Sequence, residues 1–220
     1  MATTITPFTV TALSPALGAE ITGLDLAAEL APETVAALVK AWHQHIVLLF
    51  RDQTLNEDEQ LRFAARFGPL AERGRPATRR HENTGHNASV TLVSNIRKDG
   101  KAIGSLPDGD MMFHHDMLHS ENPHKATLLY SVELPSHGGN TLFANMYAAY
   151  DTLADDLKAA IEGREVMQVY NYLPTVRVDP DEDPSKYDHY VQPAVIVHPR
   201  TGRRALYVNQ LMSARIEGLE

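Results

Sequence analysis

The chain has 220 residues, a length that predicts a single domain at ~100–200 residues per domain. Its 20 basic residues against 28 acidic ones give a formal net charge of −8, which argues against binding to nucleic acid or to an anionic membrane. The absence of cysteine excludes disulfides, thiolate metal sites and a cysteine nucleophile, so 11 histidines and the carboxylates remain as strong metal ligands. The chain shows neither a signal peptide nor an apolar run of ~18 residues, and we therefore expect a cytoplasmic protein.

The first third of the chain predicts a strand pair and two helices. Residues 8–26 alternate short β-type runs with glycines and indicate strand, turn and strand. An amphipathic helix follows Pro32, because apolar residues recur there at helical spacing. Residues 46–50 predict a strand buried on both faces. Asn56 and Glu59 have the spacing of a capping box, which predicts a second helix that ends at Gly68-Pro69.

The middle of the chain predicts a long polar loop. Residues 71–89 carry arginines and histidines among Gly, Pro, Thr and Asn, and such a length favours either a functional lid or a solvated flexible loop. We expect residues 71–110 to form a loop-rich lid or substrate region.

From residue 90 onward the pattern turns to β. The predicted strands are residues 90–93, 111–113, 126–132, 141–143, 166–170, 194–198 and 205–208. Asn145 is expected to cap a helix that runs to Ile161. The last two strands flank a hairpin turn with Gly202. Many short strands with helices mostly near the start predict a mainly β fold, a sandwich or barrel with helical additions.

The densest cluster of possible metal ligands lies at residues 113–121. On an extended strand His114 and Asp116 would point to one face and His115 to the other. Two histidines and a carboxylate on one face of an octahedron bind Fe(II) and leave positions open for a co-substrate and O₂. Spacing alone is weak evidence, because about one such match arises by chance in this composition. His119 and Glu121 repeat the spacing and serve as a decoy.

The remaining histidines and arginines favour structural roles. His43 and His45 close the first helix, where a cation complements the helix dipole, and His137 and His198 lie at turns. Three arginines near the Gly202 turn indicate a solvated face. The chain has no phosphate-binding glycine loop, no Gly-x-Ser-x-Gly elbow and no His-Glu-x-x-His motif.

Six collinear motifs are more specific than any of these spacings. They are GAEITGLDL at residues 18–26, FRDQ at 50–53, RFGPL at 66–70, FHHD at 113–116, ELPSHGGNTLF at 133–143 and HPRTGRRALYVN at 198–209. In this order the chain resembles the taurine dioxygenase and chlorophenoxyacetate dioxygenase family of Fe(II)/2-oxoglutarate enzymes. The resemblance runs from about residue 8 to the end of the chain.

The resemblance implies a double-stranded β-helix, or jelly roll, with flanking helices in a single domain over residues 1–220. It places the metal ligands at His114 and Asp116, the threonine that binds 2-oxoglutarate at Thr141, and a substrate contact at Asp110. The implied reaction hydroxylates a small anionic substrate, of the sulfonate or carboxylate type, with O₂ and releases succinate and CO₂. Candidate donors to such an anion are Arg73, Arg75, Arg79 and Arg80. Whether the chain forms a homo-oligomer is left open.

One departure from the family pattern concerns the end of the chain. Members carry the distal histidine of the triad and the 2-oxoglutarate arginine beyond the position of Asn209, and no residue here matches them. We therefore expect that C-terminal strands are missing and that apolar strand edges near residues 205–220 are exposed. The alternative function is a truncated, inactive jelly-roll remnant that acts only in binding or oligomerisation. A cofactor-free cupin-like isomerase is a third reading, which the Gly-Gly-x-Thr match does not support.

Overall fold

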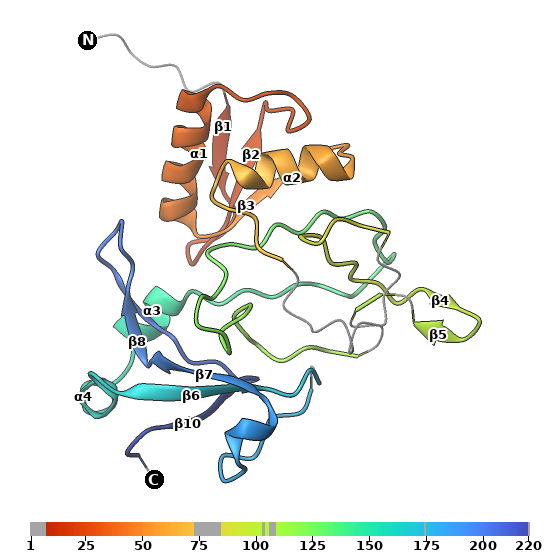
Figure 1. Cartoon of the computed structure of the whole chain (residues 1–220). Coiled ribbons are helices and arrows are strands. Elements are labelled where there is room, and N and C mark those ends of the chain that lie inside the picture. Colours follow the sequence, from red (N-terminus) through yellow and green to blue (C-terminus); the bar gives the residue numbers. More distant parts are fainter. Residues whose placement is uncertain (1–7, 73–84, 103, 106–108, 174, 220) are drawn as a thin grey trace, which may run out of the picture. The chain divides into compact units, whose positions relative to one another are not determined.

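The computed structural model describes residues 8–72, 85–102, 104–105, 109–173 and 175–219. Two compact units divide the chain. One contains Met1–Leu70 with Leu128–Ala148, and the other contains Ala71–Thr127 with Ala149–Glu220. The described part is rich in short strands and has few helices, as predicted (Figure 1). The predicted single domain over residues 1–220 stays a prediction.

In the first unit, two helices accompany a three-stranded sheet (Figure 1). The sheet has the order β1 (Thr9–Ala12), β2 (Ala19–Thr22), β3 (Leu48–Phe50), with β1 antiparallel and β3 parallel to β2. The helices are α1 (Pro32–His45) and α2 (Glu57–Ala65). Their buried side chains join those of the sheet in one core made of Phe8, Ile21, Leu26, Leu38, Ala41 and Phe63.

Local sequence signals explain where these helices begin and end. Pro32 occupies the first turn of α1, where its missing N–H costs no hydrogen bond. The predicted capping box of α2 is confirmed: Asn56 Oδ1 accepts from the Glu59 N–H at 2.9 Å, and Glu59 Oε2 accepts from the Asn56 N–H at 2.8 Å. The prediction that residues 46–50 form a doubly buried strand was wrong. Only Leu48–Phe50 form β3, and they are half-buried because β3 is an edge strand with β2 as its one partner among the described strands.

The second unit contains a three-stranded antiparallel sheet and two hairpins. Strand β6 (Glu165–Tyr170) lies between β7 (Asp188–Pro193) and β10 (Ser213–Ile216). Strands β8 (Val195–Val197) and β9 (Arg204–Leu206) form the predicted hairpin, with Gly202 at φ 69°. A short hairpin that we did not predict pairs β4 (Arg97–Lys98) with β5 (Lys101–Ala102) around Asp99-Gly100, both at positive φ. A 3₁₀ turn spans Pro184–Lys186.

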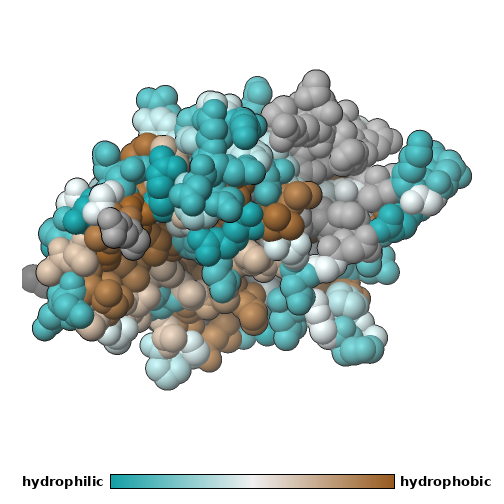
Figure 2. Space-filling view, turned by 90° about the horizontal axis from the view of Figure 1, so that it is seen from below, coloured by the Kyte–Doolittle hydropathy of each residue, from teal (hydrophilic) through white to brown (hydrophobic). Residues whose placement is uncertain are grey.

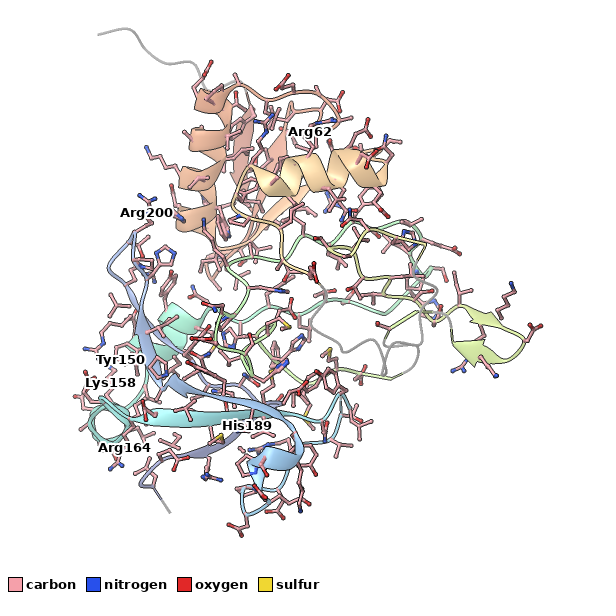
Figure 3. The ribbon with its side chains drawn as sticks, in the orientation of Figure 1. Arg62, Tyr150, Lys158, Arg164, His189 and Arg200 are labelled. Carbon is pink, nitrogen blue, oxygen red and sulfur yellow. The ribbon has the colours of Figure 1, made fainter. Side chains whose placement is uncertain are left out.

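The helix predicted after Asn145 is broken into two. Asn145 does cap it, because its Oδ1 accepts from the N–H groups of Tyr147 and Ala148 at 3.1 Å each. However, α3 (Met146–Asp151) stops after six residues, and α4 (Asp155–Ile161) begins anew. Lys158 joins the pieces, since its Nζ donates to the Asp151 carbonyl at 2.9 Å and lies 5.7 Å from the Tyr150 ring centroid (Figure 3).

Four predicted strands do not form among the described residues. Residues 111–113, 126–132 and 141–143 pair with no described strand, and residues 90–93 make only an isolated bridge between Val93 and Ser105. Large apolar side chains between residues 129 and 143 are 57–86% exposed; they are Leu129, Val132, Leu134, Leu142 and Phe143. Hydrophobic surface also interrupts the polar surface in Figure 2. Near residues 205–220, where we expected exposed apolar strand edges, β9 and β10 each have one partner among the described strands, and the side chains of residues 205–219 are mostly buried or half-buried.

Candidate metal site

His114 and Asp116 converge in the structure, as predicted. His114 Nε2 lies 3.2 Å from Asp116 Oδ1, and the two side chains are 26% and 41% exposed. The reason we gave for their convergence was wrong, because residues 111–115 form no strand and a turn follows at residues 116–119. Met117 at φ 59° turns the chain directly after Asp116. Adjacent ligands of a six-coordinate ion with bonds of ~2.1 Å stand ~3 Å apart, so the observed separation fits one shared ion.

The other ring nitrogen of His114 identifies what must lie between the pair. His114 Nδ1 lies 2.9 Å from the Met112 carbonyl oxygen, which can only accept a hydrogen bond, so Nδ1 carries a proton. A neutral imidazole then presents a lone pair at Nε2, toward a carboxylate oxygen that also only accepts. Two acceptors at 3.2 Å need a cation between them, either a proton or a metal ion. A backbone carbonyl on the remote nitrogen is also the usual support of a metal-binding histidine.

The contact between His114 and Asp116 shifts the pKa values of both residues. The hydrogen bond to Asp116 raises the pKa of His114 above 6.5, against the opposing effect of burial. The same bond is the largest cause that lowers the pKa of Asp116 to about 2, and the Thr127 hydroxyl, which donates to Asp116 Oδ2, lowers it further. Asp116 is therefore an anion across the physiological range, as a metal-binding carboxylate must be.

The neighbouring histidines have other surroundings. His115 packs edge-on against Tyr207, with ring centroids 5.2 Å apart. His119 is 7% exposed and packs against Tyr170 at 5.2 Å, whereas Glu121 is exposed. His119 and Glu121 therefore have the sequence spacing of His114 and Asp116 but different surroundings. Burial lowers the pKa of both His115 and His119.

Buried contacts hold the turn that carries the pair. Leu118 is fully buried in a cluster with Tyr170, Leu211 and Met212. Gln192 of β7, itself 7% exposed, donates from Nε2 to the carbonyls of Leu118 at 3.3 Å and Ser120 at 2.8 Å. These bonds fix the backbone just after Asp116.

Two of these supporting residues escaped the sequence analysis. Thr127 lies in a segment whose apolar pattern indicated only a strand, and Gln192 carries no motif. No pairwise spacing relates either residue to Asp116. A polar residue within a mostly apolar run, a feature that Ser131 shares, was the one available signal for Thr127.

The other predicted site residues lie on other segments of the chain. Thr141 is exposed on an irregular segment of the first unit, and Asp110 is exposed beside Gly109 in the second. Their roles stay predictions. Arg73, Arg75, Arg79 and Arg80 lie outside the described residues, as does much of the predicted lid. Within the part of the chain that the structure describes, no third His, Asp or Glu completes a metal-binding group.

Comparison with known proteins assigns the family. The model of the "Taurine catabolism dioxygenase TauD, TfdA family" matches residues 9–220. The chain belongs to this family. An (S)-phenoxypropionate/alpha-ketoglutarate-dioxygenase of Sphingobium herbicidovorans is 31% identical over 97% of the chain and 74% of its own length. An alpha-ketoglutarate-dependent sulfate ester dioxygenase of Pseudomonas putida is 31% identical over 92% of the chain and 66% of its own length.

A solved structure supports the fold. The crystal structure of a taurine dioxygenase from Burkholderia xenovorans superposes with a TM-score of 0.75 and 28% identity, over 97% of this chain and 67% of that one. The predicted mainly β, jelly-roll fold class is thereby confirmed. The predicted absence of C-terminal strands stays a prediction. No helix within the described residues of this family member is long and apolar enough to cross a membrane.

Proposed function

We propose that the chain is an Fe(II)- and 2-oxoglutarate-dependent dioxygenase that hydroxylates a small anionic substrate. The observation that carries this proposal is the convergence of His114 Nε2 and Asp116 Oδ1 at 3.2 Å, on the His-x-Asp motif of a chain in this family. An imidazole with a hard carboxylate, in a chain without thiolates, suits Fe(II) or Mn(II).

His114 and Asp116 would hold the metal ion, and Thr141 would contact 2-oxoglutarate. The bound ion supplies the O₂ activation that couples oxidative decarboxylation of 2-oxoglutarate to hydroxylation of the substrate. The protein's part is geometric. The Met112 carbonyl keeps the proton of His114 on Nδ1 and so leaves Nε2 free to bind, and Gln192 holds the turn that aims Asp116.

The proposed substrate is a small carboxylate, sulfonate or sulfate ester. Two relatives are named for substrates of this kind, a phenoxypropionate and a sulfate ester. Recognition of such an anion would use arginine, which offers paired donors to a planar carboxylate. Arg73, Arg75, Arg79 and Arg80 are the candidates for this role, with Asp110 as a further substrate contact.

Anaerobic binding tests the proposal without the need to know the substrate. Fe(II) and 2-oxoglutarate are added to the purified 220-residue chain without oxygen, and the visible iron-to-ketoacid charge-transfer band is recorded. We expect the band in the wild-type chain and its loss in His114→Gln. The matched control is His189→Gln on β7, because His189 is exposed and its Nδ1 lies 3.0 Å from the carbonyl oxygen of the nearby Tyr187 (Figure 3).

The possible outcomes separate the two functions under consideration. A band in wild type and His189→Gln but not in His114→Gln supports the dioxygenase. A folded wild-type chain that gives no band overturns the proposal for this chain and favours the inactive remnant. A band that survives in His114→Gln overturns the ligand assignment.

A further inference from the structure

The two carboxylate oxygens of Asp116 have different partners. Oδ1 faces His114 Nε2 at 3.2 Å, and Oδ2 accepts a hydrogen bond from the Thr127 hydroxyl. Asp116 and Thr127 are eleven residues apart and belong to the same unit. The carboxylate is therefore oriented from both sides, with one oxygen toward the candidate ligand partner and the other engaged by a neutral donor.

We propose that Thr127 is a positioning residue that holds the Asp116 carboxylate with Oδ1 directed at the metal position that it shares with His114. The inference rests on the proposed function, because it assumes that His114 and Asp116 bind a metal ion. A carboxylate can bind a cation through one oxygen or through both. The Thr127 hydroxyl takes one of the two lone pairs of Oδ2 and so fixes the rotation of the carboxylate, which directs Oδ1 toward His114 Nε2.

The consequence concerns the affinity of the site for the ion. An Asp116 carboxylate that Thr127 already orients gives up less rotational freedom when it binds, so we expect the Thr127 hydrogen bond to strengthen metal binding.

The side chain of Thr127 suits this role. Its β-branched Cβ restricts rotation about χ1, which keeps the hydroxyl directed at Asp116. Thr127 and Asp116 are both exposed, so water competes for Oδ2. We therefore expect an effect on metal affinity at the lower end of the ~10–100-fold range seen when a partner of a metal ligand is removed.

Co(II) is the probe, because its visible absorption responds to coordination number. Thr127→Val removes the hydroxyl and keeps the shape, and Thr127→Ser keeps the hydroxyl. Thr201→Val is the matched control, since it removes a threonine hydroxyl from the β8–β9 turn, where it lies 3.1 Å from His198 Nδ1. The Kd for Co(II) and the visible spectrum are measured for each variant, and the unfolding temperature verifies that each one folds.

We expect Thr127→Val to raise the Kd for Co(II) about tenfold and to alter the absorption intensity. Thr127→Ser and Thr201→Val should resemble wild type in both respects. An unchanged Kd and spectrum in Thr127→Val overturn the inference and leave the proposed function intact. If Thr127→Ser behaves like Thr127→Val, the hydroxyl is not the cause and the inference falls. If wild type itself binds no Co(II), the inference and the proposed function fall together.

Discussion

The segments 114–116 and 119–121 share the pattern histidine, any residue, acid, yet they fold into opposite arrangements. In the first, imidazole and carboxylate converge at 3.2 Å on the surface of the unit. In the second, His119 is buried against Tyr170 and Glu121 is exposed. The turn at residues 116–119, with Met117 at positive φ, separates the two patterns and changes the direction of the chain between them.

The hydrogen-bond partners of the two segments differ as well. The His114–Asp116 pair has the Met112 carbonyl on one side and the Thr127 hydroxyl on the other. His119 Nδ1 is buried and has no hydrogen-bond partner among the described residues. The comparison teaches that ligand spacing describes two side chains, whereas a metal site also requires the groups that orient them.

The largest expected effect comes from an acid-to-amide change in each segment. Asp116→Asn removes a charged ligand and should weaken Co(II) binding by more than ~100-fold, because the loss of a ligand exceeds the loss of one of its supporting partners. Glu121→Gln makes the same chemical change at an exposed position and should leave the Kd unchanged. Isothermal titration of both variants measures the difference. Equal Kd values for the two would remove the distinction between the segments.

A second variant tests whether the buried amide supports the first segment. Gln192→Leu leaves the carbonyls of Leu118 and Ser120 without their donor, and we expect a loss of ~2 kcal/mol in unfolding free energy together with weaker Co(II) binding. Gln168→Leu is the control. Gln168 is fully buried on the neighbouring strand β6, but it bonds to the Tyr207 carbonyl and to Ser213 instead.

Urea unfolding and Co(II) titration together separate the two glutamines. Gln168→Leu should lose comparable stability and keep its metal affinity. If both variants retain wild-type affinity, Gln192 stabilises the sheet without positioning the turn. If both lose affinity, general loosening of the second unit explains the effect.

Local signals predicted those elements whose cause lies within a few residues. The capping box of Asn56 and Glu59, the helix after Pro32 and the Gly202 hairpin all formed as expected. Each depends on hydrogen bonds or backbone angles that neighbouring residues determine. By contrast, the apolar runs at 126–132 and 141–143 formed no strand, because a strand also needs a partner and none among the described strands pairs with them.

In the candidate site, too, local patterns predicted some residues, and others depend on the tertiary fold. Spacing and family resemblance found His114 and Asp116, but the assumed strand was wrong, and a turn brings the side chains together instead. Thr127 and Gln192 contact the site from positions 11 and 72–74 residues away from their partners. Contacts of this length depend on the tertiary fold, which no local pattern encodes, and sequence reasoning therefore could not find them.

The smallest expected effect is a pH dependence that belongs to the second segment alone. Burial is the largest cause that lowers the pKa of His119 below 6.5; the charge of His124 adds to it and that of Asp188 opposes it, while the Tyr170 and Tyr172 rings pack beside the imidazole. In the unfolded chain, His119 takes up a proton near the ordinary histidine pKa of ~6.5. In the folded chain, burial opposes this protonation. Stability contributed by neutral His119 is present above that pH and is lost as the pH falls below it.

The free energy of unfolding in urea is measured at about pH 7.5 and about pH 5.5, and its change between the two pH values gives this loss. The change should be smaller in His119→Gln than in wild type, because glutamine does not titrate. The exposed control His189→Gln should keep the wild-type change. An equal change in wild type and His119→Gln would mean that burial does not keep the proton from His119. The contrast between His114, whose pKa is raised by its partner, and His119, whose pKa is lowered by burial, would then rest on geometry alone.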